Sequence, residues 1–320
     1  MHKHWVGRSV ASPRRVPVAA VLLALVMAAG LVQHDSRIDL HAPAPTADSA
    51  ARAALVELAP QDVDVAKAAA AALVSRFGGT ADWETGTLTV PGEDPLVYLY
   101  VARRHATTGE WQVALEGSSA FPVLAEQGQM ALAGTPSAEL LATTTTQAAS
   151  NGAAELSLPW KKGTTWRLTG GPHSNNGGRR PWSSLDFAGP RPGMTVKVRA
   201  ARGGIVVRPC ANLVQVRHSG GWTTSYYHVK RIAVRAGQRV ARGAFLGYTS
   251  TRAGCGGRAT GPHLHFALLR YGSYVNIRGH AIGGWTVREG SSQYRGCMVK
   301  GSRKRCAPSG SIYNTGAIGD

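Results

Sequence analysis

The chain has 320 residues and a formal net charge of +18, and 43% of its residues are hydrophobic. This length accommodates two modest domains and at least one real hydrophobic core. The basic charge raises the question of nucleic acid, but there is no helical Arg/Lys stripe and no RNA-binding motif, so nucleic acid is not an expected partner.

The N-terminus reads as an export segment. Residues 1–15 carry four basic residues and no acid, and residues 16–32 form an uninterrupted apolar run. Small residues at Ala28, Ala29 and Gly30 are typical of a signal peptidase site, so we expect residues 1–30 to be a secretory signal. An uncleaved membrane anchor is the alternative, because the run is near the lower limit for spanning a bilayer. Both interpretations place the remainder of the chain outside the cytoplasm.

The next segment, 31–153, predicts a small α+β unit. It opens with an Ala/Pro-rich linker over 35–60, and an alanine-rich helix is expected over about 62–77. Three β-like runs then follow, separated by Gly, Pro and Asp turn signals: TGTLTV, PLVYLYVARR and EWQVALEG. Residues 134–153 are small and polar, and we interpret them as a flexible boundary.

Beyond residue 153 the sequence changes to an all-β pattern. No convincing helical period occurs in 154–320, and no internal repeat is evident. The expected strands are short and punctuated by glycine: MTVKVRAA, GGIVVRP, NLVQVRHS, WTTSYYHV, HLHFALLR and SYVNIRG. The sequence therefore predicts a β module from about 154 to the end.

Charge is divided between the two parts. Residues 154–320 contain 26 Lys and Arg against four acids, a net charge of +22, whereas residues 35–153 contain six basic and 14 acidic residues, a net charge of −8. Opposite charges of this size favour coverage of one part by the other, and an anionic partner for the basic part. A bacterial cell wall suits an exported protein better than nucleic acid does.

Four cysteines all lie in the last third of the chain. An even number in an exported protein favours disulfides. Three pairings are possible, and we expect Cys210 with Cys255 and Cys297 with Cys306, because the second closes a local hairpin and the first ties two loops that flank the GPHLHF strand. A structural zinc site is the competing interpretation, but the sequence has no CxxC spacing.

The run GPHLHF at 261–266 places two histidines two residues apart in a strand. Residues i and i+2 of a strand share a face, so His263 and His265 are expected to project together while Leu264 and Phe266 face the other way. Paired imidazoles on one face suggest a metal site. Ordinary polar surface is the alternative.

Other candidate ligands lie in glycine- and serine-rich surroundings. His173 stands in GGPHSNNGG and Asp186 in SSLDFAG, and Asp186 is one of only four acids in the β module. A salt-bridge role is the alternative for Asp186. His228 ends the expected strand WTTSYYH, where alternation would put Tyr226 on its face and Tyr227 on the other; a lone histidine at a strand end is usually plain surface.

The order His173, Asp186, His228 and then HLH at 263–265 resembles the lysostaphin-type zinc endopeptidases. The 13-residue spacing from His173 to Asp186 is similar to the branch of LasA staphylolysin and the β-lytic proteases. LPWKKGTTW at 158–166, GWTTSYYH at 221–228 and the cysteine positions also look like that branch. The resemblance covers about 155–318.

The resemblance implies a role for each residue. His173, Asp186 and His265 would bind one Zn²⁺, and His228 and His263 would be catalytic. Tyr294, in SSQYRGC, is a further candidate as an oxyanion donor, with ordinary loop packing as the alternative. The remaining histidines of the module lack a partner in the matched pattern and are assigned to surface or packing: His218 and His280.

We therefore expect a compact antiparallel β catalytic domain at 154–320, preceded by an acidic α+β propeptide at 31–153. The implied function is that of a secreted, monomeric zinc endopeptidase acting on Gly- and D-Ala-containing peptide crosslinks of peptidoglycan. Its expected partners are wall peptides, the anionic cell wall and its own propeptide. A non-hydrolytic wall-binding or activator module of the same fold is the alternative; a complete ligand set argues against it.

Overall fold

The computed structural model describes residues 45–58, 65–92, 94–145, 156–174 and 179–316. The expected signal segment, residues 1–30, lies outside the described residues. Among the helices within these ranges, none combines the length and the apolar character that crossing a bilayer requires.

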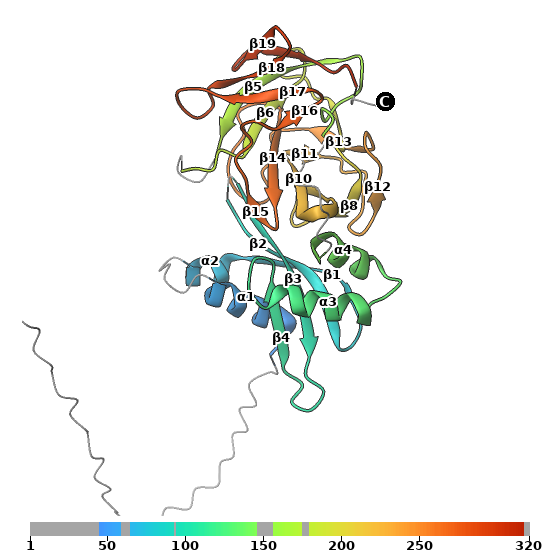
Figure 1. Cartoon of the computed structure of the whole chain (residues 1–320). Helices are drawn as coiled ribbons and strands as arrows, with labels where there is room; N and C mark the ends of the chain where they lie inside the picture. The colour runs from blue at the N-terminus through green and yellow to red at the C-terminus, as the bar shows by residue number, and fades with distance from the viewer. Residues whose placement is uncertain (1–44, 59–64, 93, 146–155, 175–178, 317–320) are drawn as a thin grey trace, which may run out of the picture. The chain divides into compact units, whose positions relative to one another are not determined.

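The N-terminal part is a four-stranded antiparallel sheet with helices on both faces (Figure 1). Its strands follow one another in chain order: β1 (Leu73–Gly79), β2 (Trp83–Val90), β3 (Leu96–Arg104) and β4 (Trp111–Leu115). Its helices are α1 (Ala47–Leu58), α2 (Val65–Ala71), α3 (Phe121–Ala131) and α4 (Pro136–Thr145).

Strand β3 shows why this unit holds together. Leu99 and Val101 pack in a cluster with α3 and α4, whereas Tyr100 and Ala102 pack in a second cluster with α1 and α2. Because successive strand residues point to opposite faces, a sheet covered on both sides needs apolar residues at every position. This accounts for the continuous apolar run in β3.

The linker expected over 35–60 contains helix α1, Ala47–Leu58, which buries Ala51 and Leu55, so that expectation is wrong for the second half of the segment. Two further expectations for this part are also wrong. The helix expected over 62–77 ends at Ala71, and residues 73–79 form β1, because Val74 pairs with Leu88 and completes the sheet. The sequence predicts a flexible boundary over 134–153, but 136–145 is helix α4, whose Leu140 and Leu141 are fully buried; the rest of the segment, from 146, lies outside the described residues. In both places tertiary packing outweighs local composition.

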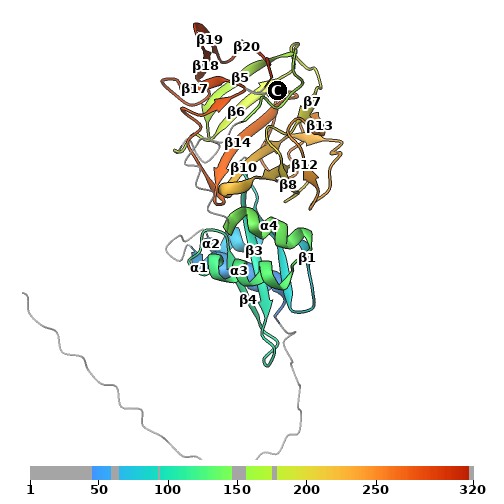
Figure 2. The same ribbon diagram turned by 45° about the vertical axis from the view of Figure 1, so that its right-hand side comes forward.

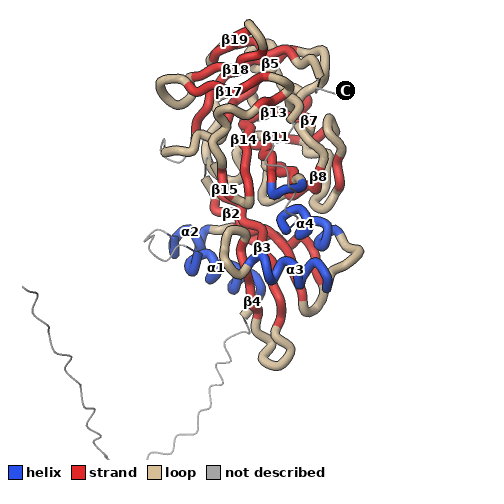
Figure 3. Tube along the Cα trace, in the orientation of Figure 1, coloured by secondary structure: helices blue, strands red, loops and turns tan. Residues whose placement is uncertain are grey.

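The C-terminal part is almost entirely β, as Figure 3 shows. Within the described residues its one helical element is a single 3₁₀ turn, Ser219–Gly221. The main antiparallel sheet has the order β12 (Arg239–Val240), β8 (Gly204–Val207), β9 (Val214–Arg217), β10 (Trp222–Tyr227), β14 (Leu264–Arg270), β6 (Ser184–Ala188), β5 (Thr165–His173) and β20 (Gly310–Tyr313), with β15 (Ser273–Tyr274) paired to β14.

Two smaller antiparallel sheets complete this β module. One has the order β11 (Val229–Lys230), β13 (Phe245–Thr249) and β7 (Lys197–Arg199). The other has the order β16 (Ala281–Ile282), β17 (Trp285–Glu289), β18 (Gly296–Lys300) and β19 (Arg303–Cys306). The fold class expected from the sequence, a mainly β module preceded by a small α+β unit, is confirmed.

Strand β14 runs through the middle of the main sheet, between β10 and β6 (Figure 2). Its Leu264, Phe266 and Leu268 are buried in the main hydrophobic core. The alternation of the strand therefore leaves the opposite face of β14 for polar side chains, at the level of His265.

The four cysteines are paired as Cys210–Cys255 and Cys297–Cys306, the two pairs expected from the sequence. The second disulfide joins β18 to β19, where the two residues are direct cross-strand partners. The first joins the loops that follow β8 and β13, next to the buried residues Leu213 and Tyr227.

Candidate active site

Three side chains converge on one point beside β14. The ligand-type atoms of His173, Asp186 and His265 all lie within 4.8 Å of one another. His265 Nδ1 is 3.1 Å from Asp186 Oδ1 and 3.3 Å from His173 Nε2, and His173 Nε2 is 3.5 Å from Asp186 Oδ1. Two imidazole nitrogens and one carboxylate oxygen at such separations suit a divalent metal ion that keeps a further position open.

The sheet register brings these residues together. His265 in β14 is the direct cross-strand partner of Asp186 in β6, and Asp186 also pairs with Gly170 in β5. A Cβ atom at Gly170 would lie 2.5 Å from Asp186 Oδ2, so glycine at this position leaves room for the carboxylate. His173 ends β5 after two irregularities in the register, which redirect the chain toward the site.

Backbone carbonyls orient the imidazoles. His173 Nδ1 lies 2.7 Å from the Gly171 carbonyl oxygen and donates to it, which leaves Nε2 with a lone pair directed at the cluster. The ring of Tyr294 stacks on His173, with centroids 4.1 Å apart, and supports the same orientation. Fixing the second ring nitrogen in this way is typical of metal-binding histidines.

The two histidines expected to be catalytic lie next to the cluster. His263 Nε2 is 3.6 Å from Asp186 Oδ1, and its Nδ1 donates to the Gly261 carbonyl oxygen at 2.8 Å. His228 Nδ1 donates to the Arg252 carbonyl oxygen at 2.9 Å, and its ring centroid is 4.7 Å from that of His263. Each histidine therefore keeps Nε2 as an acceptor for a proton.

Alternation along the strand predicts that the His228 side chain shares a face with Tyr226, and this prediction is wrong. Its backbone has a φ of 60°, in the left-handed region, so the alternation of β10 stops at Tyr227. The ring of His228 stacks on Tyr227 with centroids 4.3 Å apart, while Tyr226 is buried in the main core. This turn of the backbone directs His228 toward His263.

Burial and neighbouring charges set the protonation states. Burial acts to raise the pKa of Asp186, but His173 and His265 hold it well below its usual value. Burial acts to lower the pKa of His265, yet the carboxylates of Asp94 and Asp186 raise it to about 10. Burial, followed by the repulsion of His263, lowers the pKa of His228 to about 4, so His228 is neutral at neutral pH.

Of the other residues considered from the sequence, one lies at the site and two lie outside it. Tyr294 lies at the site through its stacking on His173. His218 is buried away from it, bonded to the Gly203 carbonyl oxygen and Thr224 Oγ1, and His280 packs edge-on against Trp222. The assignment of His218 and His280 to packing agrees with these contacts.

Sequence reasoning missed Asp94. This residue lies in the turn between β2 and β3, and its Oδ1 is 2.6 Å from His265 Nε2. The turn has the sequence PGEDPL, in which the acid resembles any turn residue, so no local signal distinguishes Asp94 from the other acids of the N-terminal part. The missed Gly170 carries an equally weak signal, because glycine is frequent throughout the chain.

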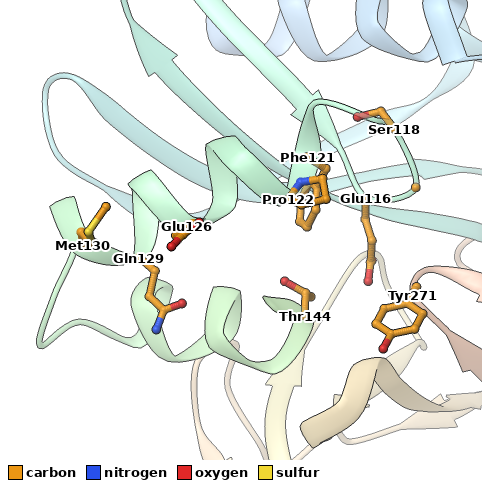
Figure 4. Close-up of a pocket in the computed structure, with 10 residues that line it drawn as sticks. Glu116, Ser118, Phe121, Pro122, Glu126, Gln129, Met130, Thr144 and Tyr271 are labelled. Atoms are coloured by element: carbon orange, nitrogen blue, oxygen red, sulfur yellow. The ribbon is translucent and has the colours of Figure 1, made fainter. Parts of the chain in front are cut away.

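One cavity lies apart from the candidate site. It measures about 760 Å³ and is lined by residues that include Glu116, Phe121, Met130, Thr144 and Tyr271. Figure 4 shows the Glu116 side chain directed toward Tyr271 in this cavity. None of the five site residues lines it: His173, Asp186, His228, His263 and His265.

Known proteins share the sequence around this site. Residues 180–277 match the model of peptidase family M23, a range that contains Asp186, His228, His263 and His265 and begins after His173. The chain is 34% identical over 148 residues to the β-lytic metalloendopeptidase of Lysobacter enzymogenes, covering 43% of this chain and 82% of that protein.

The match to two further relatives covers a smaller share of each relative's length. The protease LasA of Pseudomonas aeruginosa is 37% identical over 196 residues, covering 57% of this chain and 46% of LasA, so the chain spans about half the length of that relative. The peptidoglycan DD-endopeptidase ShyA of Vibrio cholerae is 38% identical over 101 residues, covering 30% of this chain and 22% of ShyA. The resemblance inferred from the sequence is thus confirmed, and the chain belongs to peptidase family M23, a family of metalloendopeptidases.

Proposed function

We propose that this protein is a secreted zinc metalloendopeptidase that hydrolyses peptide crosslinks of bacterial peptidoglycan. The observation that carries the proposal is the convergence of His173, Asp186 and His265 within 4.8 Å, with two further histidines beside them. A structural metal site would use four protein ligands, whereas three ligands with free imidazoles nearby suit catalysis.

Zinc is the metal that fits the donor set. Two imidazoles and one carboxylate are a common ligand set for catalytic zinc, and the three ligand atoms lie within 4.8 Å of one another. When bound, zinc supplies a Lewis acid that polarises a carbonyl group and makes water a better nucleophile at neutral pH.

His228 and His263 are proposed to handle the protons of the reaction. Each donates Nδ1–H to a backbone carbonyl oxygen, so each offers Nε2 to accept the proton of the attacking water. The same nitrogens, once protonated, would donate to the leaving amine or to the oxygen of the tetrahedral carbon. Tyr294, stacked on His173, is a second proposed donor to that oxygen.

Peptidoglycan is the proposed substrate for two reasons. One relative is by name a peptidoglycan DD-endopeptidase, and the β module carries a net charge of +22, which favours attraction to an anionic cell wall. Bonds beside glycine and D-alanine are the proposed cleavage sites. The sequence expectation for residues 1–30 supports secretion.

The N-terminal unit is proposed to be a propeptide that covers the site until it is removed. Its net charge of −8 complements the basic module. Its β2–β3 turn contacts the site directly through Asp94 and His265, and the amide of Gly92 donates to the Cys255 carbonyl oxygen at 2.8 Å. Opposite charges of this kind steer two surfaces together.

The decisive experiment uses the module 154–320 and defined muropeptides with Gly-Gly or D-Ala-Gly crosslinks, with products identified by mass spectrometry. We expect cleavage that requires zinc, and loss of both zinc and cleavage in Asp186→Ala. Tight wall binding without any cleavage product by the zinc-loaded module would favour the non-hydrolytic alternative. Full zinc content in Asp186→Ala would refute the ligand assignment.

A further inference from the structure

The N-terminal unit contributes a carboxylate to the surroundings of the metal cluster. Asp94 Oδ1 lies 2.6 Å from His265 Nε2, and the side chains of Asp94 and His265 are 6% and 5% exposed. Ser184 Oγ donates to the same carboxylate oxygen at 3.4 Å. A hydrogen bond from an imidazole N–H to a carboxylate at such a distance, shielded from water, is stronger than one on a surface.

The turn that carries Asp94 is held on both sides. The Gly92 amide donates to the Cys255 carbonyl oxygen at 2.8 Å, and the Tyr274 hydroxyl donates to the Pro95 carbonyl oxygen at 2.9 Å. Val97, which follows, is fully buried in a cluster with Cys255 and residues near it. Asp94 therefore reaches His265 from a fixed turn.

The geometry separates Asp94 from the ligand atoms. His265 directs Nδ1 toward Asp186 and His173, and it directs the opposite ring nitrogen, Nε2, toward Asp94. Asp94 is absent from the group of side chains whose ligand atoms lie within 4.8 Å of one another. It is thus placed to bind the imidazole and not the metal.

We propose that Asp94 is a positioning residue that assembles the metal site in the full-length chain. By accepting the Nε2 hydrogen bond, Asp94 keeps the proton of a neutral His265 on Nε2 and leaves the Nδ1 lone pair for zinc. The carboxylate also makes the imidazole a stronger donor to the metal. This inference rests on the proposed zinc site.

Zinc affinity should therefore depend on whether the N-terminal unit is still attached. The hairpin turn that covers the site also strengthens zinc binding there. Release of the N-terminal unit removes the carboxylate from His265, so the full-length chain should hold zinc more tightly than the released module. The unit would then act as an aid to metal loading as well as a cover.

The test measures zinc affinity in the full-length chain by competition with a chromophoric chelator. Asp94→Ala is expected to bind zinc about 10- to 100-fold more weakly, the usual effect of losing the carboxylate partner of a ligand histidine. Asp94→Asn, which keeps a neutral acceptor of the same shape, should lose less. The control is Asp82→Asn, which removes the same charge from an exposed turn of the same sheet.

A spectroscopic measurement distinguishes a role of Asp94 in positioning His265 from a role in the stability of the fold alone. In protein labelled with ¹⁵N-histidine, the Nε2–H signal of His265 should be visible and shifted downfield by the carboxylate, and it should change in Asp94→Ala but not in Asp82→Asn. The thermal unfolding of each variant is recorded, and Asp94→Asn provides the comparison if Asp94→Ala is unstable.

Two results would overturn the proposal while the full-length chain still binds zinc. One is unchanged or tighter zinc binding in both Asp94 variants. The other is the loss of an oxygen ligand from zinc in Asp94→Ala, seen by X-ray absorption, because Asp94 would then bind the metal itself. Asp94-dependent zinc binding in a chain whose released module cleaves no muropeptide would refute the proposed function and leave this inference standing.

Discussion

A buried ion pair connects the N-terminal unit to the β module. Glu116, just after β4, and Arg217, at the end of β9, are each 2% exposed, and Glu116 Oε2 lies 2.5 Å from Arg217 Nη1. We predict that Glu116→Gln, which removes the negative charge and keeps the shape, destabilises the full-length chain because it leaves the guanidinium charge buried without a counter-charge.

The size of the effect follows from the surroundings of the pair. Removing one partner of a buried ion pair costs about 3–5 kcal/mol. Among the described residues, Glu116 Oε1 and Arg217 Nε have no hydrogen-bond partner, so no neighbour compensates for the lost charge. Because glutamine still offers one carbonyl oxygen to Arg217, we expect the lower end of the range, about 3 kcal/mol.

The assay is urea unfolding of the full-length chain, followed by tryptophan fluorescence. The control is Glu139→Gln, because the pair of Glu139 with Arg239 also joins the two parts but its side chains are 52% and 69% exposed. Exposed pairs contribute about 0–1 kcal/mol. The double variant Glu116→Leu/Arg217→Met should recover most of the lost stability, since an apolar pair of similar volume often replaces a buried ion pair without loss.

Equal losses in Glu116→Gln and Glu139→Gln would refute this reasoning, because the argument depends on the difference in burial. Failure of the double variant to recover stability would show that Glu116 and Arg217 make further stabilising interactions besides their contact with each other. A loss confined to Glu116→Gln and recovered in the double variant would establish that the buried pair stabilises the full-length chain and the exposed pair does not.

Three further predictions concern the site and the core of the β module. His228→Ala and His263→Ala should each retain zinc while kcat falls about 10²- to 10⁴-fold, the range for a positioned acid–base group. Gly170→Ala should weaken zinc binding, because its Cβ would lie 2.5 Å from Asp186 Oδ2 and displace the carboxylate. Burial lowers the pKa of His218 to about 4 from an unfolded value of 6.5, so its contribution to stability is full above pH 6.5 and is lost as the pH falls toward 4. That loss amounts to about 3 kcal/mol, and it should be much smaller in His218→Gln.

Each of these has a measurement that decides it. Elemental analysis showing zinc loss in His263→Ala would mean that the HxH pair is assigned in the wrong order. Chelator competition should show weaker zinc binding for Gly170→Ala but not for Gly261→Ala, whose added Cβ would meet no atom within 4 Å. Urea unfolding between pH 7 and pH 4 tests His218, and equal pH slopes in the two proteins would contradict the predicted pKa effect.

The candidate site could be read from the sequence to the extent that its residues carry local signals. The HxH spacing, an isolated acid in a basic module and glycine-rich surroundings mark His263, His265, Asp186 and His173. Period-two alternation places Leu264 and Phe266 in the core and His265 on the opposite face, as the structure has them. These features depend on residue type and on spacing between residues that are close in the sequence.

Other features depend on residues far apart in the chain. The helix expected over 62–77 becomes a strand after Ala71 because β2 is available to pair with it, and the local alanine pattern contains no information about that partner. His228 leaves the expected face because its backbone adopts a left-handed conformation. The prediction from alternation holds only while the backbone stays extended.

The sequence by itself determined the class of the fold, the cysteine pairs and the five histidine and aspartate residues gathered at the site: His173, Asp186, His228, His263 and His265. Only the tertiary structure decided which atoms of these residues face one another, that Gly170 leaves room for Asp186, and that Asp94 meets His265 across 171 residues of chain. The physical reason is that residue types and their spacing specify local conformation and burial. Strand register and contacts between separate units are instead settled by packing over the whole chain.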